Sequence, residues 1–395
     1  MGLSPFLLLC TTGFFAIFSS TISKSPVLPL FAAYLGGNPL EVGIVSSISA
    51  FMGVIASVPA GVYSDKVGRR KMLILSSIIF ATAPFLYLIV TNIYQLMFVR
   101  FYHGLATAIF VPVAMAYISE LYNKKRGERL GWFSTATLLG RFLAPMLSGV
   151  VISIFVFLPD WGYKAVYLLC AVTGTLTLII AIALPNTKTT QRMITNQELF
   201  RNFKTIILNR GIMFTCIVES SVLFAYGTFE TFLPLYAVRA GYTAYEIGAM
   251  LSVQVITLAL SKPFMGKLSD KHGRRAQIVI GSSITAISIG AIPFLNNFLY
   301  LLLLSIIVGL SLSIVTSATS AYIADLSKDK TYGSAMGLLG SIMDIGHTTG
   351  PLVSGIVALK FGIDKSFFGA SAVVAITGLL FLTFSITTRD HCCPK

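Results

Sequence analysis

The chain has 395 residues, of which 55% are hydrophobic and only 11% are charged, and its mean hydropathy is +0.82. Soluble domains carry about 25% charged residues, so this composition excludes an ordinary soluble enzyme or binding module. The formal net charge is +14. It does not call for a nucleic-acid partner, because membrane topology accounts for the basic residues, as shown below.

Twelve apolar segments follow one another along the chain. About 20 apolar residues let a helix cross a bilayer core, and the spans are predicted at 5–34, 41–63, 72–91, 93–119, 131–156, 165–184, 211–237, 245–266, 275–294, 297–324, 333–359 and 364–387. They are continuously apolar, unlike the alternating strands of a barrel. We therefore expect an all-α polytopic membrane protein. The first span starts without Lys or Arg, so we expect a retained helix rather than a signal peptide.

Positive charge gathers in every second connection between these spans. The opposite connections hold few basic residues, so the positive-inside rule predicts a multi-pass protein of the cell membrane with both termini in the cytoplasm. The basic connections hold Lys66, Arg69, Arg70, Lys71, Lys124, Lys125, Arg126, Arg129, the 185–210 segment, Lys267, Lys271, Arg274, Arg275, Lys328 and Lys330.

The sequence repeats itself. GVYSDKVGRR at 61–70 matches GKLSDKHGRR at 266–275, LPLFAAYLG at 28–36 matches LPLYAVRAG at 233–241, and AYISEL at 116–121 matches AYIADL at 321–326. We expect two homologous six-helix halves, 1–184 and 211–395, joined by a cytoplasmic linker at 185–210. Repeats with an even number of helices share one topology, so their symmetry axis lies along the membrane normal.

The repeated decamer resembles the signature loop of the major facilitator superfamily, and it lies between spans 2 and 3 and again between spans 8 and 9. Twelve spans and a polar central linker agree with that family. The resemblance implies a transporter that works by alternating access around a midplane site. It also implies that the charged residues of these loops latch the two halves in one facing state. The alternative is that the arginines only anchor the topology.

The loop residues have individual physical roles. Gly61 and Gly266 are expected to let another helix approach closely, and Gly68 and Gly273 to adopt positive φ in a tight reversal. The carboxylates of Asp65 and Asp270 are expected to cap a neighbouring helix. The arginines of each loop are expected within reach of an acid in the same half: Arg69 and Arg70 near Glu120, and Arg274 and Arg275 near Asp325.

A further match joins GRFLAPMLSG at 140–149 to GHTTGPLVSG at 346–355. Both resemble the Gly-Pro motif in span 5 of drug:proton antiporters, although the first copy has Ala144 before its proline. Pro145 and Pro351 are expected to bend their helices, because proline removes an i→i−4 hydrogen bond. The glycines are expected to allow close packing between the halves: Gly140, Gly149, Gly346, Gly350 and Gly355.

Ionisable residues inside the spans are the candidates for the substrate and proton pathway, because charge is costly there. They are Lys24, Arg100, Arg141, Glu219, Glu230, Asp344 and His347. Glu219 and Glu230 are about three helical turns apart and so share a face. We expect Glu230 to pair with Lys24 or Arg100 in one facing state and to be released in another, which suits a proton carrier. Glu219 and Asp344 compete for that role. The alternative is that each acid is a structural hydrogen-bonding residue.

Similar antiporters carry an acid near the position of Lys24, so the lysine argues against a simple pump for cationic drugs. With Arg100 and Arg141 it favours an anionic substrate, because buried cations attract anions. We expect proton-coupled efflux of a small amphipathic compound by a monomer. The alternatives are uptake or exchange of an organic anion or sugar, and a receptor that does not transport.

Nothing in the sequence points to an enzyme, a cofactor or a bound metal. No phosphate-binding loop appears, and the five cysteines have neither metal-ligand spacing nor a paired framework.

Overall fold

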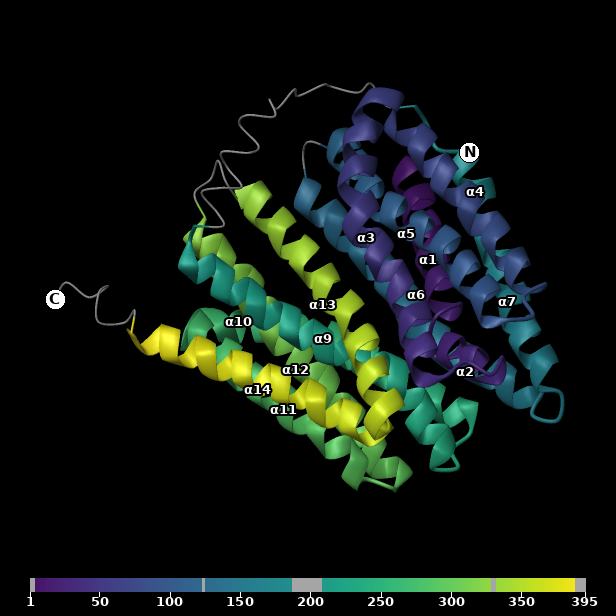
Figure 1. Ribbon diagram of the computed structural model, residues 1–395. Helices are drawn as coiled ribbons and strands as arrows, with labels where there is room; N and C mark the ends of the chain where they lie inside the picture. Colours follow the sequence, from purple (N-terminus) through teal and green to yellow (C-terminus); the bar gives the residue numbers. More distant parts are fainter. Residues whose placement is uncertain (1–3, 123–124, 187–207, 328–331, 388–395) are drawn as a thin grey trace. The chain divides into compact units, whose positions relative to one another are not determined.

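The computed structural model describes residues 4–122, 125–186, 208–327 and 332–387, which are nearly all α-helical (Figure 1). The first half contains α1 (Pro5–Ile22), α2 (Val27–Tyr34), α3 (Pro39–Val67), α4 (Arg69–Tyr87), α5 (Ile93–Leu121), α6 (Arg126–Ile154) and α7 (Pro159–Ile182). The second contains α9 (Arg210–Arg239), α10 (Ala244–His272), α11 (Arg274–Ala291), the 3-10 turn η1 (Ile292–Phe294), α12 (Phe298–Leu326), α13 (Tyr332–Phe361) and α14 (Ile363–Thr387).

The predicted spans are confirmed. Among the described residues, eleven helices are long and apolar enough to cross a membrane when α1 and α2 count as one. The 30-residue α13 occupies the remaining predicted span. One feature differs from expectation: the first span is not continuous, because its helix is interrupted at residues 23–26.

The chain forms two compact units that do not follow the sequence halves. Unit 1 comprises Met1–Arg192 and Glu230–Ser252, and unit 2 comprises Met193–Phe229 and Val253–Lys395. In unit 1, α1 packs against α6 and α7, and α5 packs against α3 and α4; in unit 2, α11 packs against α12 and α14. Residues 187–207, which make up most of the predicted linker, lie outside the described residues. So do the adjacent Cys392 and Cys393.

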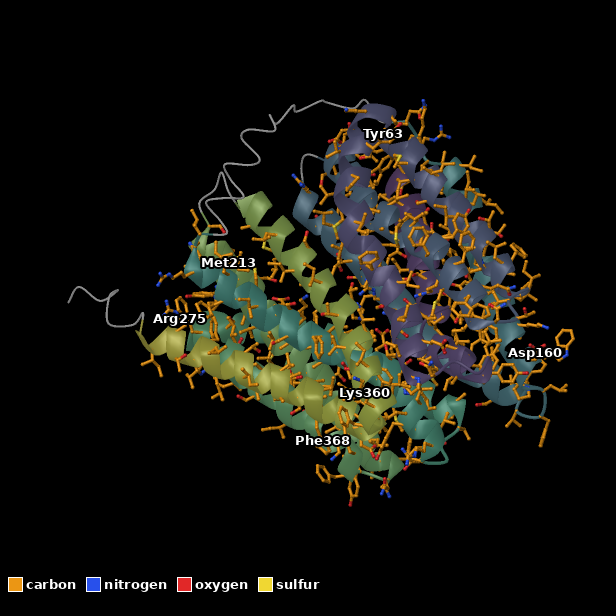
Figure 2. All side chains as sticks on the ribbon, viewed as in Figure 1. Tyr63, Asp160, Met213, Arg275, Lys360 and Phe368 are labelled. Atoms are coloured by element: carbon orange, nitrogen blue, oxygen red, sulfur yellow. The ribbon has the colours of Figure 1, made fainter. Side chains whose placement is uncertain are left out.

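Each unit has two well-separated ends (Figure 2). Tyr63, near the end of α3, lies at one end of unit 1, and Asp160, at the start of α7, lies at the other. In unit 2, Arg275 lies toward one end and Lys360 toward the other. Tyr63 and Arg275 lie beside the two signature loops. Each signature loop therefore lies at one end of its unit.

The starts of α3 and α10 also match in sequence, NPLEVG at 38–43 with TAYEIG at 243–248, and capping explains the shared glutamate. The Asn38 side chain accepts from the Glu41 amide (3.0 Å), and the Glu41 carboxylate accepts from the Asn38 amide (2.8 Å). Thr243 and Glu246 make the same reciprocal pair, with amide-to-side-chain distances of 2.8 and 3.3 Å. Two orphan amides are satisfied at each helix start, which is a capping box. The repeated glutamate therefore determines where α3 and α10 begin.

Candidate functional site

The break in the first span is the centre of the candidate site. Pro26 cannot donate a backbone hydrogen bond, so the helical ladder stops before it. The last ladder bond before it runs from Ser25 N to the Thr21 carbonyl (2.9 Å), and the ladder resumes with Leu28 N to the Lys24 carbonyl (3.0 Å). Figure 1 shows α1 and α2 as separate helices on either side of this point. Discontinuous helices of this kind form the binding sites of many secondary transporters.

Three consecutive residues of the break contact three different helices. Arg100 of α5 donates to Ser23 Oγ (3.3 Å). Lys24 Nζ donates to Glu230 Oε2 of α9 at 2.7 Å, with side chains 22% and 12% exposed. Ser148 Oγ of α6 donates to the Ser25 carbonyl (3.0 Å). The expected ion pair of Glu230 with Lys24 or Arg100 is therefore present, with Lys24 as the partner.

Arg100 lies in a buried cluster of neutral groups. It is 2% exposed, and it donates weakly to the Tyr87 hydroxyl (3.5 Å) as well as to Ser23. Tyr87 stacks on Tyr167 with ring centroids 4.3 Å apart, and its hydroxyl lies 3.4 Å from His103 Nδ1. In the part of the chain that the structure describes, no acid forms an ion pair with this guanidinium, and its Nε has no hydrogen-bond partner.

Arg141 lies midway along α6 and is exposed. A Cβ added at the preceding Gly140 would lie 2.8 Å from the Phe14 carbonyl of α1, and Pro145, one turn later, abuts Gly248 of α10. Residues four apart share a helix face, so Arg141 lies on the face that packs against α10 one turn later. Its positive charge acts on Lys24.

The same face of α6 is joined to the first turns of α10. Ser252 Oγ donates to the Phe142 carbonyl (2.9 Å) and accepts from Met146 N (3.0 Å). A Cβ added at Gly248 would meet the Pro145 carbonyl at a forbidden distance, and one added at Gly149 would meet Ala244. Gly149 thus allows the expected close packing, and α10 provides its partner.

The two acids of α9 have opposite environments. Glu219, in unit 2, is 0% exposed, and neither carboxylate oxygen accepts a hydrogen bond from the described residues. Thr319 of α12 lies beside it but donates to the Val315 carbonyl (2.9 Å), and Lys262 of α10 acts on it electrostatically. Glu230, in unit 1, is ion-paired with Lys24.

Asp344 and His347 of α13 are half-buried. His347 stacks on Tyr226 of α9 with centroids 5.5 Å apart, while the Asp344 carbonyl accepts from Thr348 Oγ1 (2.7 Å). Glu219, Asp344 and His347 all belong to unit 2, whereas Lys24, Arg100, Arg141 and Glu230 belong to unit 1. Lys24 thus connects the charges of unit 1, because it pairs with Glu230 and the charges of Arg100 and Arg141 act on it.

The signature loops form ion pairs only in part as expected. Gly68 and Gly273 have φ of 103° and 92°, which confirms the tight reversals. Arg69 lies 3.0 Å from both Asp65 and Glu120, and Arg274 lies 3.1 Å from Asp325 and pairs with Asp270. The expectation that Asp65 and Asp270 cap a helix was wrong: neither α4 nor α11 has a side-chain cap, because these carboxylates pair with arginine.

Arg70 and Arg275 were expected near Glu120 and Asp325 but bind elsewhere. Arg70 donates to the Ile182 carbonyl at the end of α7 (2.6 Å). Arg275 donates to the Tyr322 hydroxyl (2.8 Å) and to the Ser385 carbonyl in the last turn of α14 (3.2 Å). Carbonyls at helix C-termini lack intrahelical partners and attract cations. These arginines therefore tie helices together within each half.

Two expectations about glycine also need correction. A Cβ added at Gly61 or Gly266 would meet no described atom within 4 Å, so no helix approaches closely there. Gly140 packs against α1, and Gly346 and Gly350 pack against α9, so these three act within a half rather than between halves. Gly355 is buried. The helices α6 and α13 run on through Pro145 and Pro351, and the predicted bends stay predictions.

Comparison with known proteins now decides the family. The family model of the Major Facilitator Superfamily matches residues 9–253 and 241–391. The chain belongs to the Major Facilitator Superfamily. It is therefore a multi-pass membrane transporter with the major facilitator fold, built as two homologous six-helix bundles.

Relatives cover nearly the whole chain. The chain is 27% identical to the uncharacterized MFS-type transporter MJ1560 of Methanocaldococcus jannaschii, over 90% of this chain and 92% of that protein. It is 27% identical to the multidrug resistance protein MdtG of Klebsiella pneumoniae, over 91% and 88%. It is 22% identical to multidrug resistance protein 2 of Bacillus subtilis, over 89% and 88%.

Solved structures share the fold at low identity. A POT family transporter in complex with 5-aminolevulinic acid superimposes with a TM-score of 0.80 at 12% identity, covering 97% of this chain and 96% of that one. The nucleoside transporter NupG gives 0.76 at 14% identity, covering 96% and 99%. At these identities the similarity concerns the fold.

Sequence reasoning missed the break and the residues that support it: Ser23, Ser25, Ser148, Tyr87 and Tyr167. One signal was available. Residues 19–26 read SSTISKSP, a polar run that ends in proline within an otherwise apolar span.

Proposed function

We propose that this transporter exports a small amphipathic compound in exchange for protons. It works as a monomer in the cell membrane, with both of its termini on the cytoplasmic side. The observation that carries the proposal is the Lys24–Glu230 ion pair at the break in the first span (2.7 Å). It joins a residue of the first repeat to one of the second. The multidrug names of two relatives support export of an amphipathic compound.

The proposed coupling follows from the ion pair. Alternating access requires the two repeats to change their contacts around the site. A paired lysine holds Glu230 as a carboxylate, whereas a separated Glu230 in an apolar surrounding favours the neutral acid. A proton taken up by Glu230 would therefore release Lys24, and its loss would restore the pair. Substrate and proton binding then alternate.

The first experiment is a thermal-shift screen of the detergent-purified protein with lipophilic cations, organic anions and neutral sugars. A ligand that binds the folded state at a hundredfold excess over Kd stabilises it by about 2.7 kcal/mol. Stabilisation by sugars alone would favour uptake or exchange of a sugar instead. No stabilisation by any group, together with no flux, would favour a receptor that does not transport.

The coupling is then tested in proteoliposomes with the compound that the screen identifies. Glu230→Gln should abolish transport driven by a pH gradient and leave substrate counterflow intact, because an amide cannot exchange the proton. Glu246→Gln is the matched control, since Glu246 only caps the start of α10. Unchanged pH-driven transport in Glu230→Gln would remove Glu230 from the mechanism.

Glu219 is the competing carrier. It is fully buried and accepts no hydrogen bond from the described residues. Glu219→Gln, measured in the same two assays, should retain pH-driven transport if Glu230 is the carrier. Loss of pH-driven transport with intact counterflow in Glu219→Gln alone would assign the proton to Glu219.

A further inference from the structure

The interior of unit 1 holds more positive than negative charge. Its described ionised residues away from the ends of the spans are three cations, Lys24, Arg100 and Arg141, and one acid, Glu230. The other acids of the unit lie near helix ends: Glu41, Asp65, Glu120, Glu128, Asp160 and Glu246. A charged group in a membrane interior is costly unless it is paired. Two of the three cations therefore have no anion of their own here.

The only described acid of this interior is already committed to Lys24. Glu230 Oε2 lies 2.7 Å from Lys24 Nζ. Arg100 is held by neutral hydroxyls and is almost fully buried, so it is enclosed by protein. Arg141 differs from both: it is exposed, and it forms no ion pair or hydrogen bond with the described residues.

Arg141 lies on a side of α6 that faces other helices of the protein. Its helix packs on α1 at Gly140 and on α10 at Pro145, so this side of α6 is not a lipid-facing side. A guanidinium at mid-membrane is costly when it faces lipid. The half-buried Phe14, whose carbonyl contacts Gly140, stacks on Phe18 at 5.9 Å and gives the neighbouring turns an aromatic surface.

We propose that the transported compound is an amphipathic anion whose carboxylate, sulfonate or phosphonate binds Arg141, with the charge of Lys24 nearby and the apolar part along α1. This inference names the substrate class of the proposed transport function and rests on it. The planar guanidinium offers two parallel donors to such an oxyanion. The anion supplies the countercharge that unit 1 lacks. A lipophilic cation would add a positive charge to an interior that already has an excess.

The test uses three probes that share one skeleton: naphthalene-2-sulfonate, trimethyl(2-naphthyl)ammonium and 2-naphthalenemethanol. Their binding to the full-length protein in detergent is measured by calorimetric titration in low-chloride buffer. The sulfonate should bind at least about tenfold more tightly than the ammonium probe. Arg141→Gln should weaken sulfonate binding about tenfold, as expected for a charge-assisted hydrogen bond, and should change binding of the alcohol less than about twofold.

Arg126→Gln is the matched control, because Arg126 is an exposed arginine at the first position of the same helix. It should leave all three affinities unchanged. Tighter binding of the ammonium probe, equal sulfonate affinity in Arg141→Gln and wild type, or no binding of any probe would each overturn the inference. Addition of chloride should compete only weakly; displacement of the sulfonate by chloride at equal concentration would assign the site to a small inorganic anion and would also overturn it.

Flux separates this inference from the proposed function. Transport of the ammonium probe driven by a pH gradient would leave the proposed function standing and would refute the anionic class. Sulfonate binding that depends on Arg141, with no pH-driven flux in proteoliposomes, would support the anion site and refute proton-coupled transport.

Discussion

The broken first span and its counterpart in the second repeat carry the same motif but differ in structure. Leu-Pro-Leu occurs at 28–30 and again at 233–235. The first copy lies in α2, after the break, whereas α9 runs without interruption from Arg210 to Arg239 through Pro234. A proline inside the helix is therefore not what breaks it. The difference is Pro26, for which the second repeat has Thr231.

The supporting helices show the same contrast. Ser148 of α6 and Ser354 of α13 occupy matching positions in their motifs. Ser148 donates to the Ser25 backbone carbonyl (3.0 Å), and Ser354 bonds to the Thr228 side chain (2.7 Å). In the first repeat a neighbouring helix satisfies the Ser25 carbonyl, which has no helical donor because the residue four positions later is Pro29. In the second, the same position only joins two side chains.

The largest effect is expected from changing the charges at the break, which only the first repeat has. Lys24→Glu places a second carboxylate against Glu230, and we expect the transport rate in proteoliposomes to fall at least about 100-fold, because removal of one partner leaves an uncompensated buried charge. The exchanged double variant, Lys24→Glu with Glu230→Lys, should recover at least about tenfold over either single variant. A double variant as inactive as the single variants would show that the pair is not used as a pair.

An exposed ion pair in the same unit is the control. Lys164 and Asp160 of α7 lie 2.6 Å apart with side chains 39% and 44% exposed. Exposed pairs contribute about 0–1 kcal/mol. Lys164→Glu should therefore change transport less than about twofold. Size-exclusion profiles of all variants exclude misfolding as the cause of lost activity.

Helix positions could be predicted from this sequence because hydropathy determines them, and every predicted span has its helix. The helix caps were not: the caps expected from Asp65 and Asp270 are absent, while Glu41 and Glu246 complete two capping boxes that were not predicted. The positive φ at Gly68 and Gly273 was also predictable, since a reversal within one residue favours glycine.

The contacts of the polar residues were less predictable, because they depend on packing between helices. Sequence restricted the partner of Glu230 to Lys24 or Arg100, and the structure provides Lys24. It did not separate Arg69, which pairs with Glu120, from Arg70, which binds the end of α7. Consecutive residues on a helix point in directions about 100° apart, and only the surrounding helices decide which direction meets the acid.

Close helix packing within each repeat offers a second test, of moderate size. A Cβ added at Gly346 would meet the Ser220 carbonyl of α9 more closely than one added at the matching Gly140 would meet the Phe14 carbonyl of α1 (2.8 Å). Overpacking typically costs about 1–3 kcal/mol. We expect Gly346→Ala to lower the thermal midpoint in detergent more than Gly140→Ala does, because the unbroken α9 has less freedom to move aside.

Gly131→Ala is the control for the substitution itself. Gly131 lies in α6, and an added Cβ would meet no described atom within 4 Å. Alanine favours a helix over glycine by about 0.5–1 kcal/mol, so this variant should be neutral or more stable. Equal midpoints for Gly346→Ala and Gly131→Ala would mean that α9 and α13 separate at little cost.

The smallest effect is expected from the two matching serines, and it tests how a neighbouring helix stabilises the break. Ser148→Ala leaves the buried Ser25 carbonyl without its side-chain donor, which should lower the free energy of unfolding by about 0.5–1.5 kcal/mol. Ser354→Ala should cost less, because the Thr228 hydroxyl still donates to the Phe224 carbonyl (3.0 Å) and stays satisfied. Thermal midpoints measured side by side give the order. If Ser354→Ala were the more damaging, the hydrogen bond to the break would add little to stability, and the opened backbone at Lys24 would depend mainly on its ion pair with Glu230.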